Sequence, residues 1–229
     1  MMIPFWRDYF DEGYLQEPPF GTLLRFFPNC NMAVRRQVLE EIGGYDIERN
    51  AGEDADLCQR ALHGGWELYF SRRAECRHEA RPNFRSLIRQ YFFYGYHFAA
   101  LYRKYREHKF EVLVSLDPRP RNSNYYPLLQ TTRIPLPVLV FISWFSVFLL
   151  LATTSLALLA AGLYVGTLAV LAAALLIFAG LFWRGPFRSL GVRRLCVYLF
   201  VTCVINSACT AGSLAGGIRN RMLFHYPGI

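Results

Sequence analysis

The sequence has no acidic residue after Asp117, and it has no charge at all from Ile134 to Trp183 or from Leu195 to Ile218. These two runs contain 50 and 24 residues. About 20 apolar residues are enough for one helix to cross a bilayer. This composition excludes an ordinary soluble domain over the second half of the chain. The first run has room for two crossings and the second for one, so the sequence predicts a membrane protein.

The sequence also lacks a Cys-x-x-Cys pair, a signal-peptide core near Met1 and a nucleic-acid-binding motif. The six cysteines are expected to be free thiols in a reducing compartment. The net charge of +8 divides into +2 for residues 1–134 and +6 for the remainder, which has six arginines and no acid. Such an excess belongs to the ends of membrane helices, so we expect no nucleic acid partner.

Three apolar segments are long enough to cross a membrane, at about 136–158, 164–183 and 196–217. The loop 184–194 carries four arginines, so the positive-inside rule places it in the cytoplasm. Two crossings before this loop place the N-terminal part on the same side. The sequence thus predicts a multi-pass protein of the cytoplasmic (inner) membrane whose N-terminal domain faces the cytoplasm.

The third crossing conflicts with that rule, because it carries Arg219 and Arg221 to the outside. Either the two arginines are tolerated there, or the last apolar run dips into the membrane and returns. Ala208, Gly212 and Gly216 recur every four residues in this run, which favours close packing against another helix.

The predicted domain organisation follows the change in composition. It comprises a partial α/β domain at 1–106, a juxtamembrane linker at 107–134, transmembrane helices within 135–218, and a basic tail at 219–229. From 83 to 105, apolar and aromatic residues recur every three or four positions, with basic residues on much of the other face. This pattern predicts an amphipathic helix that lies at the membrane surface or packs on the domain.

The polar part is organised around Glu53, Asp54 and Asp56, three acids in four positions after Gly52. They open a helix predicted for about 54–63, where the helix dipole keeps carboxylates ionised. An ionised and partly desolvated Asp at such a place can act as a general base. The alternative is that Asp54 and Asp56 only cap the helix.

Five segments follow one another between residues 29 and 95. They are Asn31–Arg36, Val38–Asp46 (with a helix expected at 35–42 and a stop at Gly43-Gly44), Gly52–Arg60, Ala74–Glu79 and Ser86–Gly95. In this order they resemble the Asn-x-Ala-x-Arg-Arg segment, Gly-Gly-Phe-Asp turn, Glu-Asp motif, His-ending segment and amphipathic helix of family 2 glycosyltransferases. The resemblance is to the C-terminal half of a catalytic domain with the GT-A fold. It implies a partial GT-A-like α/β domain, a mixed sheet with helices, followed by two or three transmembrane helices.

The resemblance implies a role for each acid. Asp54 would take the proton from the acceptor hydroxyl, and Glu53 would orient the acceptor or the base. Asp56 is either the helix cap or an acceptor- or diphosphate-binding residue. In the amphipathic helix, Arg89, Gln90 and Tyr91 would line the acceptor groove.

The resemblance also implies a divalent cation, Mn²⁺ or Mg²⁺, a nucleotide-sugar donor, and a glycan or lipid-linked acceptor. His78 would be a metal or diphosphate contact, and the alternative is a half-buried strand histidine. No Trp follows Arg89-Gln90 as in the Gln-x-x-Arg-Trp motif of processive members, so a non-processive enzyme is expected.

Family members begin with a nucleotide-binding half that contains an Asp-x-Asp. Only 52 residues precede Glu53, and their acids Asp8, Asp11 and Glu12 do not have that spacing. We therefore expect that this chain does not transfer sugar alone, and that a separate nucleotide-binding chain or an upstream part supplies the donor site.

Two other functions remain to be weighed. The chain could be an inactive, degenerate membrane subunit or scaffold of a glycan-assembly complex. A small metal-binding membrane protein using Cys58, His63, Cys76 and His78 is disfavoured, because these pairs have different spacings and make a poor zinc site.

Overall fold

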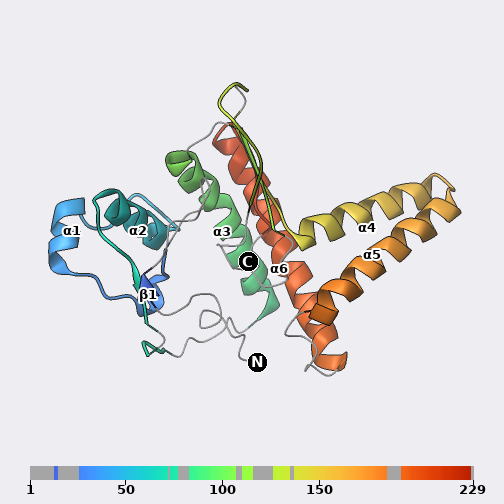
Figure 1. Ribbon diagram of the computed structural model, residues 1–229, viewed down its shortest axis with the longest axis horizontal. Coiled ribbons are helices and arrows are strands. Elements are labelled where there is room, and N and C mark those ends of the chain that lie inside the picture. Colours follow the sequence, from blue (N-terminus) through green and yellow to red (C-terminus); the bar gives the residue numbers. More distant parts are fainter. Residues whose placement is uncertain are drawn as a thin grey trace.

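The computed structural model describes residues 13–14, 26–71, 73–76, 83–106, 110–115, 126–134, 137–184 and 192–227. Its helices are the 3-10 helix η1 (Asn29–Asn31), α1 (Arg36–Ile42), α2 (Glu53–His63), α3 (Phe84–Tyr105), α4 (Trp144–Ala160), α5 (Tyr164–Arg184) and α6 (Val192–Arg219) (Figure 1). Its strands are β1 (Gly13–Tyr14), β2 (Tyr69–Phe70), β3 (Phe110–Val114), β4 (Tyr126–Thr131), β5 (Val138–Ile142) and β6 (Leu223–His225).

Glycines set the bounds of the two helices that surround the acidic stretch. α1 ends at Gly43, which is left-handed with φ 78°. Gly52, at the N-cap of α2, has φ 73°. A Cβ on Gly52 would also lie 3.3 Å from the Cδ2 atom of Leu101 in α3, so glycine suits this position for two reasons. The helices predicted at 35–42 and 54–63 are confirmed to within one residue at their starts.

The main sheet is mixed, with the strand order β4-β3-β5-β6. β3 pairs antiparallel with β4 and parallel with β5, and β5 pairs parallel with β6. A separate antiparallel pair joins β1 to β2. A mixed sheet with helices fits the predicted α/β GT-A-like class of domain.

The four strands of the main sheet lie outside the segment expected to hold the α/β domain. β3 and β4 fall within 107–134, which was expected to be a linker, and β5 falls within the first predicted crossing. Leu139 and Phe141 of β5 are fully buried. A short apolar run rich in Val and Phe suits a buried strand as well as a helix, so periodicity alone could not separate the two.

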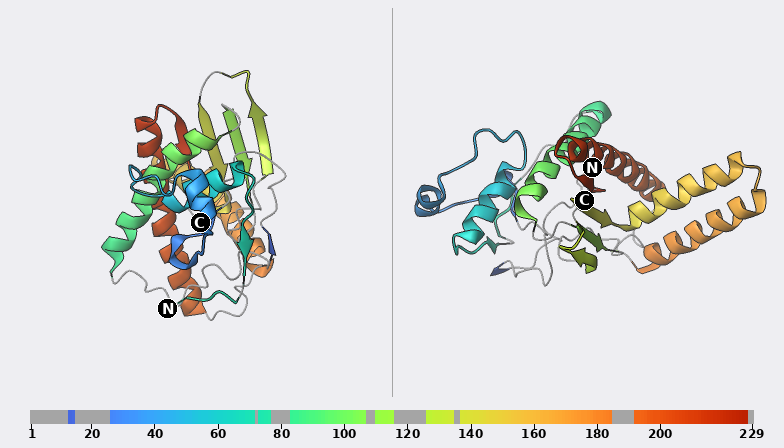
Figure 2. Two further views of the ribbon diagram at one scale, coloured as in Figure 1. Left: turned by 90° about the vertical axis from the view of Figure 1, so that its left-hand side faces the viewer. Right: turned by 90° about the horizontal axis from the view of Figure 1, so that it is seen from above.

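α3 and α6 pack along one another, as both views show (Figures 1 and 2). A Cβ added at Gly95 of α3, or at Gly212 or Gly216 of α6, would overlap the backbone of the facing helix. The predicted close packing of the small-residue face is confirmed at these two α6 glycines. The amphipathic helix predicted at 83–105 is confirmed as α3, and Asn83 caps it by accepting a hydrogen bond from the backbone N–H of Ser86 at 2.8 Å.

α4 and α5 form a hairpin that points away from the other elements (Figure 1). Its apolar side chains are largely exposed, for example Leu156 (65%), Val165 (84%) and Leu168 (67%). Within the part of the chain that the structure describes, one helical segment, Phe200–Arg219, is long and apolar enough to cross a membrane, and half of it is buried inside the protein. The two or three predicted crossings are therefore not confirmed.

The hydrophobic core includes a residue of α2 together with residues of the C-terminal elements. Ala55 of α2 and Leu101 of α3 are fully buried in one cluster with side chains of the main sheet and α6. Tyr102 of α3 packs edge-on against Phe141, with ring centroids 5.1 Å apart, and against Phe224 at 5.4 Å. Through Ala55, α2 contributes to the same core as the C-terminal part of α3.

Candidate functional site

Glu53 and Asp54 lie in the first turn of α2 and face the short helix η1. The backbone N–H of Asn29 donates to Oδ2 of Asp54 at 3.3 Å, and its side-chain Nδ2 donates to Oε1 of Glu53 at 3.2 Å. The hydroxyl of Tyr45 donates to Oδ1 of Asn29 at 2.8 Å. Asn29 therefore donates a hydrogen bond to each of the two carboxylates, and Tyr45 in turn donates one to Asn29.

Asp54 is half-buried, and its surroundings oppose its ionisation. Burial raises the pKa of the Asp54 carboxyl above its ordinary value of 3.8, and the neighbouring Glu53 raises it further. Hydrogen bonds from the backbone of Ala55 and Asn29 act in the opposite direction but do not cancel the shift. A carboxylate with a raised pKa is a stronger base than an ordinary one, which is the property that proton abstraction requires.

Sulfur atoms lie close to this carboxylate pair. The Cys58 thiol, one turn after Asp54, is buried and lies 3.9 Å from the Met32 sulfur. Burial raises the pKa of Cys58 to about 11 and that of Cys30 above its ordinary value, with smaller contributions from the Asp54 charge. The thiols are therefore protonated at neutral pH and add no negative charge beside Asp54.

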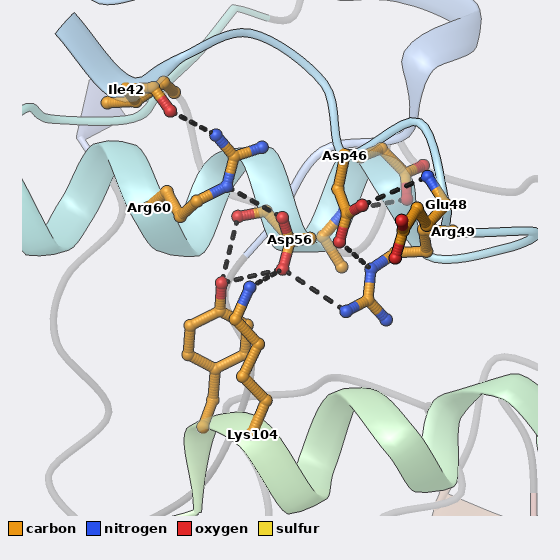
Figure 3. A network of polar contacts seen from close by, with 10 residues as sticks. Ile42, Asp46, Glu48, Arg49, Asp56, Arg60 and Lys104 are labelled. Atoms are coloured by element: carbon orange, nitrogen blue, oxygen red, sulfur yellow. Dashed lines mark hydrogen bonds and ion pairs between the residues drawn. The ribbon is translucent and has the colours of Figure 1, made fainter.

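Asp56 lies on the other side of α2 and is fully buried (Figure 3). Its Oδ2 accepts a hydrogen bond from Nε of Arg60 at 2.8 Å, and its Oδ1 accepts from Nζ of Lys104 at 2.7 Å and from the hydroxyl of Tyr105 at 2.8 Å. A guanidinium nitrogen of Arg49 lies 3.5 Å from Oδ1. The carboxylate thus joins α2, α3 and the loop before α2.

The structure corrects the expectation that Asp54 or Asp56 caps the helix. The N-cap residue of α2 is Gly52, and no side chain caps it. Burial alone would raise the pKa of Asp56, but the hydrogen bonds from Lys104, Arg60 and Tyr105 outweigh it and lower the pKa to about 2. Asp56 is therefore an ionised internal partner of three cations, and its contact with a substrate stays a prediction that this placement does not favour.

Arg89, Gln90 and Tyr91 lie in the first half of α3. Arg89 is exposed, and Nε2 of Gln90 donates to the hydroxyl of Tyr94 at 2.6 Å. Tyr91 packs edge-on against Tyr94. At 1.5 Å per residue they lie about 20 Å along α3 from Lys104, where α2 is attached. The structure does not bring them to Asp54, and their role in acceptor binding stays a prediction.

The metal expectation finds no support among the described residues. His78 lies outside them. Within the described ranges, no three His, Cys, Asp or Glu side chains form a group that could hold a metal ion. The divalent cation therefore stays a prediction, and we derive no chemical step through one.

Sequence reasoning missed the partners of Asp56. The spacing from Asp56 to Arg60 is that of an i,i+4 ion pair and could have been noticed. Lys104 and Tyr105 are far away in sequence, and no local pattern connects them to α2. Asn29 lies just before the Asn31–Arg36 segment, but the sequence pattern assigned no function to it.

Comparison with known protein families identifies the family of the chain. The model of "Glycosyl transferase family group 2" matches residues 21–184. This match covers more than half of the chain, so the chain belongs to that family.

Two curated relatives are pre-mycofactocin glycosyltransferases of Mycobacterium tuberculosis, from strains CDC 1551 / Oshkosh and ATCC 25618 / H37Rv. Each is 31% identical to this chain over 87 residues, which is 37% of this chain and 18% of the relative. The chain thus matches less than a fifth of the length of these relatives. No solved structure matches the chain.

Proposed function

We propose that this chain provides the catalytic base and the acceptor-facing part of a membrane-bound, inverting, non-processive glycosyltransferase. It moves a sugar from a nucleotide-sugar donor to a lipid-linked or envelope glycan. The observation that carries the proposal is the Glu53–Asp54 pair, which Asn29 holds at the start of α2 within the region that matches the family.

The chemistry assigned to Asp54 is a single proton transfer. As the acceptor oxygen attacks the anomeric carbon, its proton passes to the Asp54 carboxylate. The bond from that carbon to the nucleotide diphosphate breaks, and the diphosphate leaves with the bonding electrons. Attack from the side opposite the leaving group inverts the anomeric configuration. The raised pKa of Asp54 supports this role, and Glu53 is assigned to orient the acceptor.

The membrane part of the proposal rests on the uncharged run that contains α4 and α5. Leu156, Val165 and Leu168 are exposed on a hairpin that points away from the other described helices and strands (Figure 1). Exposed apolar surface of this extent is costly in water and suits lipid. We assign the hairpin and α6 to the cytoplasmic membrane, with α2 on the cytoplasmic side.

The donor site is expected to come from outside this sequence, because Asp8, Asp11 and Glu12 do not have the Asp-x-Asp spacing. We propose that a separate nucleotide-binding chain, or protein sequence corresponding to the longer relatives, provides it. The first experiment is therefore a calorimetric titration of the purified chain in detergent with uridine- and guanosine-diphosphate sugars and Mn²⁺. The absence of binding supports a donor site supplied from elsewhere. Micromolar binding shows that this chain builds a donor site of its own.

Membrane association has its own test. Reconstituted chain is floated with phospholipid vesicles after washing at alkaline pH. The double variant Leu156→Arg and Leu168→Arg is expected to bind vesicles more weakly than the wild type, with α6 unaltered. Ile47→Arg, on a 96% exposed loop residue outside the hairpin, is the matched control. Retention of the double variant would contradict insertion of the hairpin. Full cellular function of an Asp54→Asn variant would favour a non-catalytic membrane subunit instead.

A further inference from the structure

One carboxylate contributes several of the contacts that attach α2 to α3. Lys104 and Tyr105 of α3 both donate hydrogen bonds to Asp56 of α2. Stacking of His63 on Tyr105 and packing of Gly52 under Leu101 add apolar contact on either side. Asp56 therefore lies at the centre of the contact between α2 and α3.

Asp56 and Asp54 lie on opposite sides of the same helix, with Glu53 between them around the axis. Successive residues turn by about 100° around a helix axis, so Asp56 lies about 200° from Asp54. A rotation of α2 that breaks the contacts of Asp56 therefore moves Asp54 in the opposite direction, away from Asn29.

We propose that Asp56 is a positioning residue that couples the Glu53–Asp54 pair to α3. The proposal rests on the proposed function for the role of Asp54 as a base. Asp56 itself touches no reacting atom. Its four partners come from three segments: Arg49 from the loop, Arg60 from α2, and Lys104 and Tyr105 from α3.

The contacts beyond Asp56 make this position rigid. A second guanidinium nitrogen of Arg60 donates to the carbonyl oxygen of Ile42 at 2.6 Å, so the end of α1 is attached as well (Figure 3). α3 in turn packs on α6 at Gly95, where no side chain fits between the helices. Asp54 is thereby connected, through Asp56 and α3, to α6, which contains the segment Phe200–Arg219 that is long and apolar enough to cross a membrane.

The test measures the ionisation of Asp54 in the full chain without requiring catalysis. A water-soluble carbodiimide with an amine labels protonated carboxyl groups, and peptide mass spectrometry gives the labelling of Asp54 as a function of pH. The titratable groups that face Asp54 are Glu53 and Cys58 of α2, Cys30 of η1 and Tyr45 of the loop. They are the same in every variant.

Three variants are compared with the wild type. Asp56→Asn removes the charge that holds the network, and Lys104→Met removes one partner whose side chain is 44% exposed. Glu40→Gln is the matched control, because Glu40 forms an i,i+4 ion pair with Arg36 at 2.7 Å on exposed α1. The contact from Nζ of Lys104 to Oδ1 of Asp56 is 2.7 Å long as well.

Positioning predicts a specific direction of change. When α2 shifts, Asp54 gains access to water, and its labelling midpoint falls toward an ordinary carboxyl value by roughly 0.5 pH unit or more. A purely electrostatic effect of Lys104→Met has the opposite sign, since loss of a cation raises the pKa of a nearby acid. A lower midpoint in Lys104→Met, restored in Lys104→Arg, supports the proposal. An unchanged or higher labelling midpoint of Asp54 in Lys104→Met overturns the proposal. This outcome can be read from Lys104→Met even if Asp56→Asn does not fold.

A kinetic readout separates this proposal from the proposed function. Where the assembled enzyme transfers sugar, Lys104→Met is expected to lower kcat by about 10- to 100-fold with the donor KM unchanged, because small displacements of a catalytic group have effects of this size. An unchanged kcat contradicts positioning. Absence of transfer in the wild type counts against the proposed function, whereas the labelling of Asp54 still decides the role of Asp56.

Discussion

The two sides of α2 hold the same chemical group in opposite ways. On the side of η1, Asp54 is half-buried beside Glu53, it receives hydrogen bonds from backbone N–H groups, and its pKa is raised. On the side of α3, Asp56 is fully buried among Arg49, Arg60 and Lys104, and its pKa is lowered to about 2. Among the described residues no ion pair joins Asp54 to a cation, and such a carboxylate retains basicity that chemistry can use. A carboxylate surrounded by cations, as Asp56 is, stabilises the fold instead.

The largest effect that sharpens this comparison is expected on the η1 side. Asp54→Asn removes the proposed base and keeps the shape, so transfer by the assembled enzyme is expected to fall about 10²- to 10⁴-fold. Its thermal midpoint is expected to stay the same or rise, because the ionised carboxylate is unfavourable in the folded state. Initial rates and thermal denaturation of the same preparation measure both. If Asp54→Asn clearly lost stability but kept its transfer rate, Asp54 would have the structural role that is assigned here to Asp56.

The next effect is expected on the α3 side. Asp56→Asn leaves partly exposed cationic partners without their counter-ion, and such a break is expected to cost up to about 3 kcal/mol of unfolding free energy. Denaturant unfolding in detergent measures it against Glu40→Gln, whose ion pair is exposed and is expected to matter little. Equal stabilities of these two variants would remove the distinction between the network and a surface ion pair.

The smallest effect is the response to acid. The folded-state pKa of Asp56 is about 2 and its ordinary value is 3.8, so its stabilisation is present above pH 3.8 and is lost as the pH falls toward 2. The expected loss is roughly 2 kcal/mol. Asp54 has the opposite sign, since its raised pKa makes protonation favour the folded state. Unfolding curves across this range are expected to show the loss in Asp54→Asn but not in Asp56→Asn, and its persistence in Asp56→Asn would assign it to other groups.

The sequence predicted the local elements that carry the acids. α1, α2 and α3 follow from periodicity, the glycine stop after Ile42 and the cap at Asn83, all of which act within a few residues. The Glu53–Asp54 pair was found in the same way. Its assignment as a catalytic pair stays a prediction.

The sequence could not predict contacts between distant segments. β5 was assigned to a membrane helix because its pairing with β3 and β6 is not visible in any local window. The link from Lys104 to Asp56 joins residues that share no motif. It became visible only when the packing of α2 on α3 was known.

The pairing of β6 with β5 also determines the order in which the protein assembles. Residues 223–225 complete the parallel half of the sheet, but residues 143–222, with all three apolar helices, come between them and β5. During synthesis, β5 leaves the ribosome long before its second neighbour exists. Closure of the sheet is therefore a late, long-range step that follows the synthesis of α4, α5 and α6.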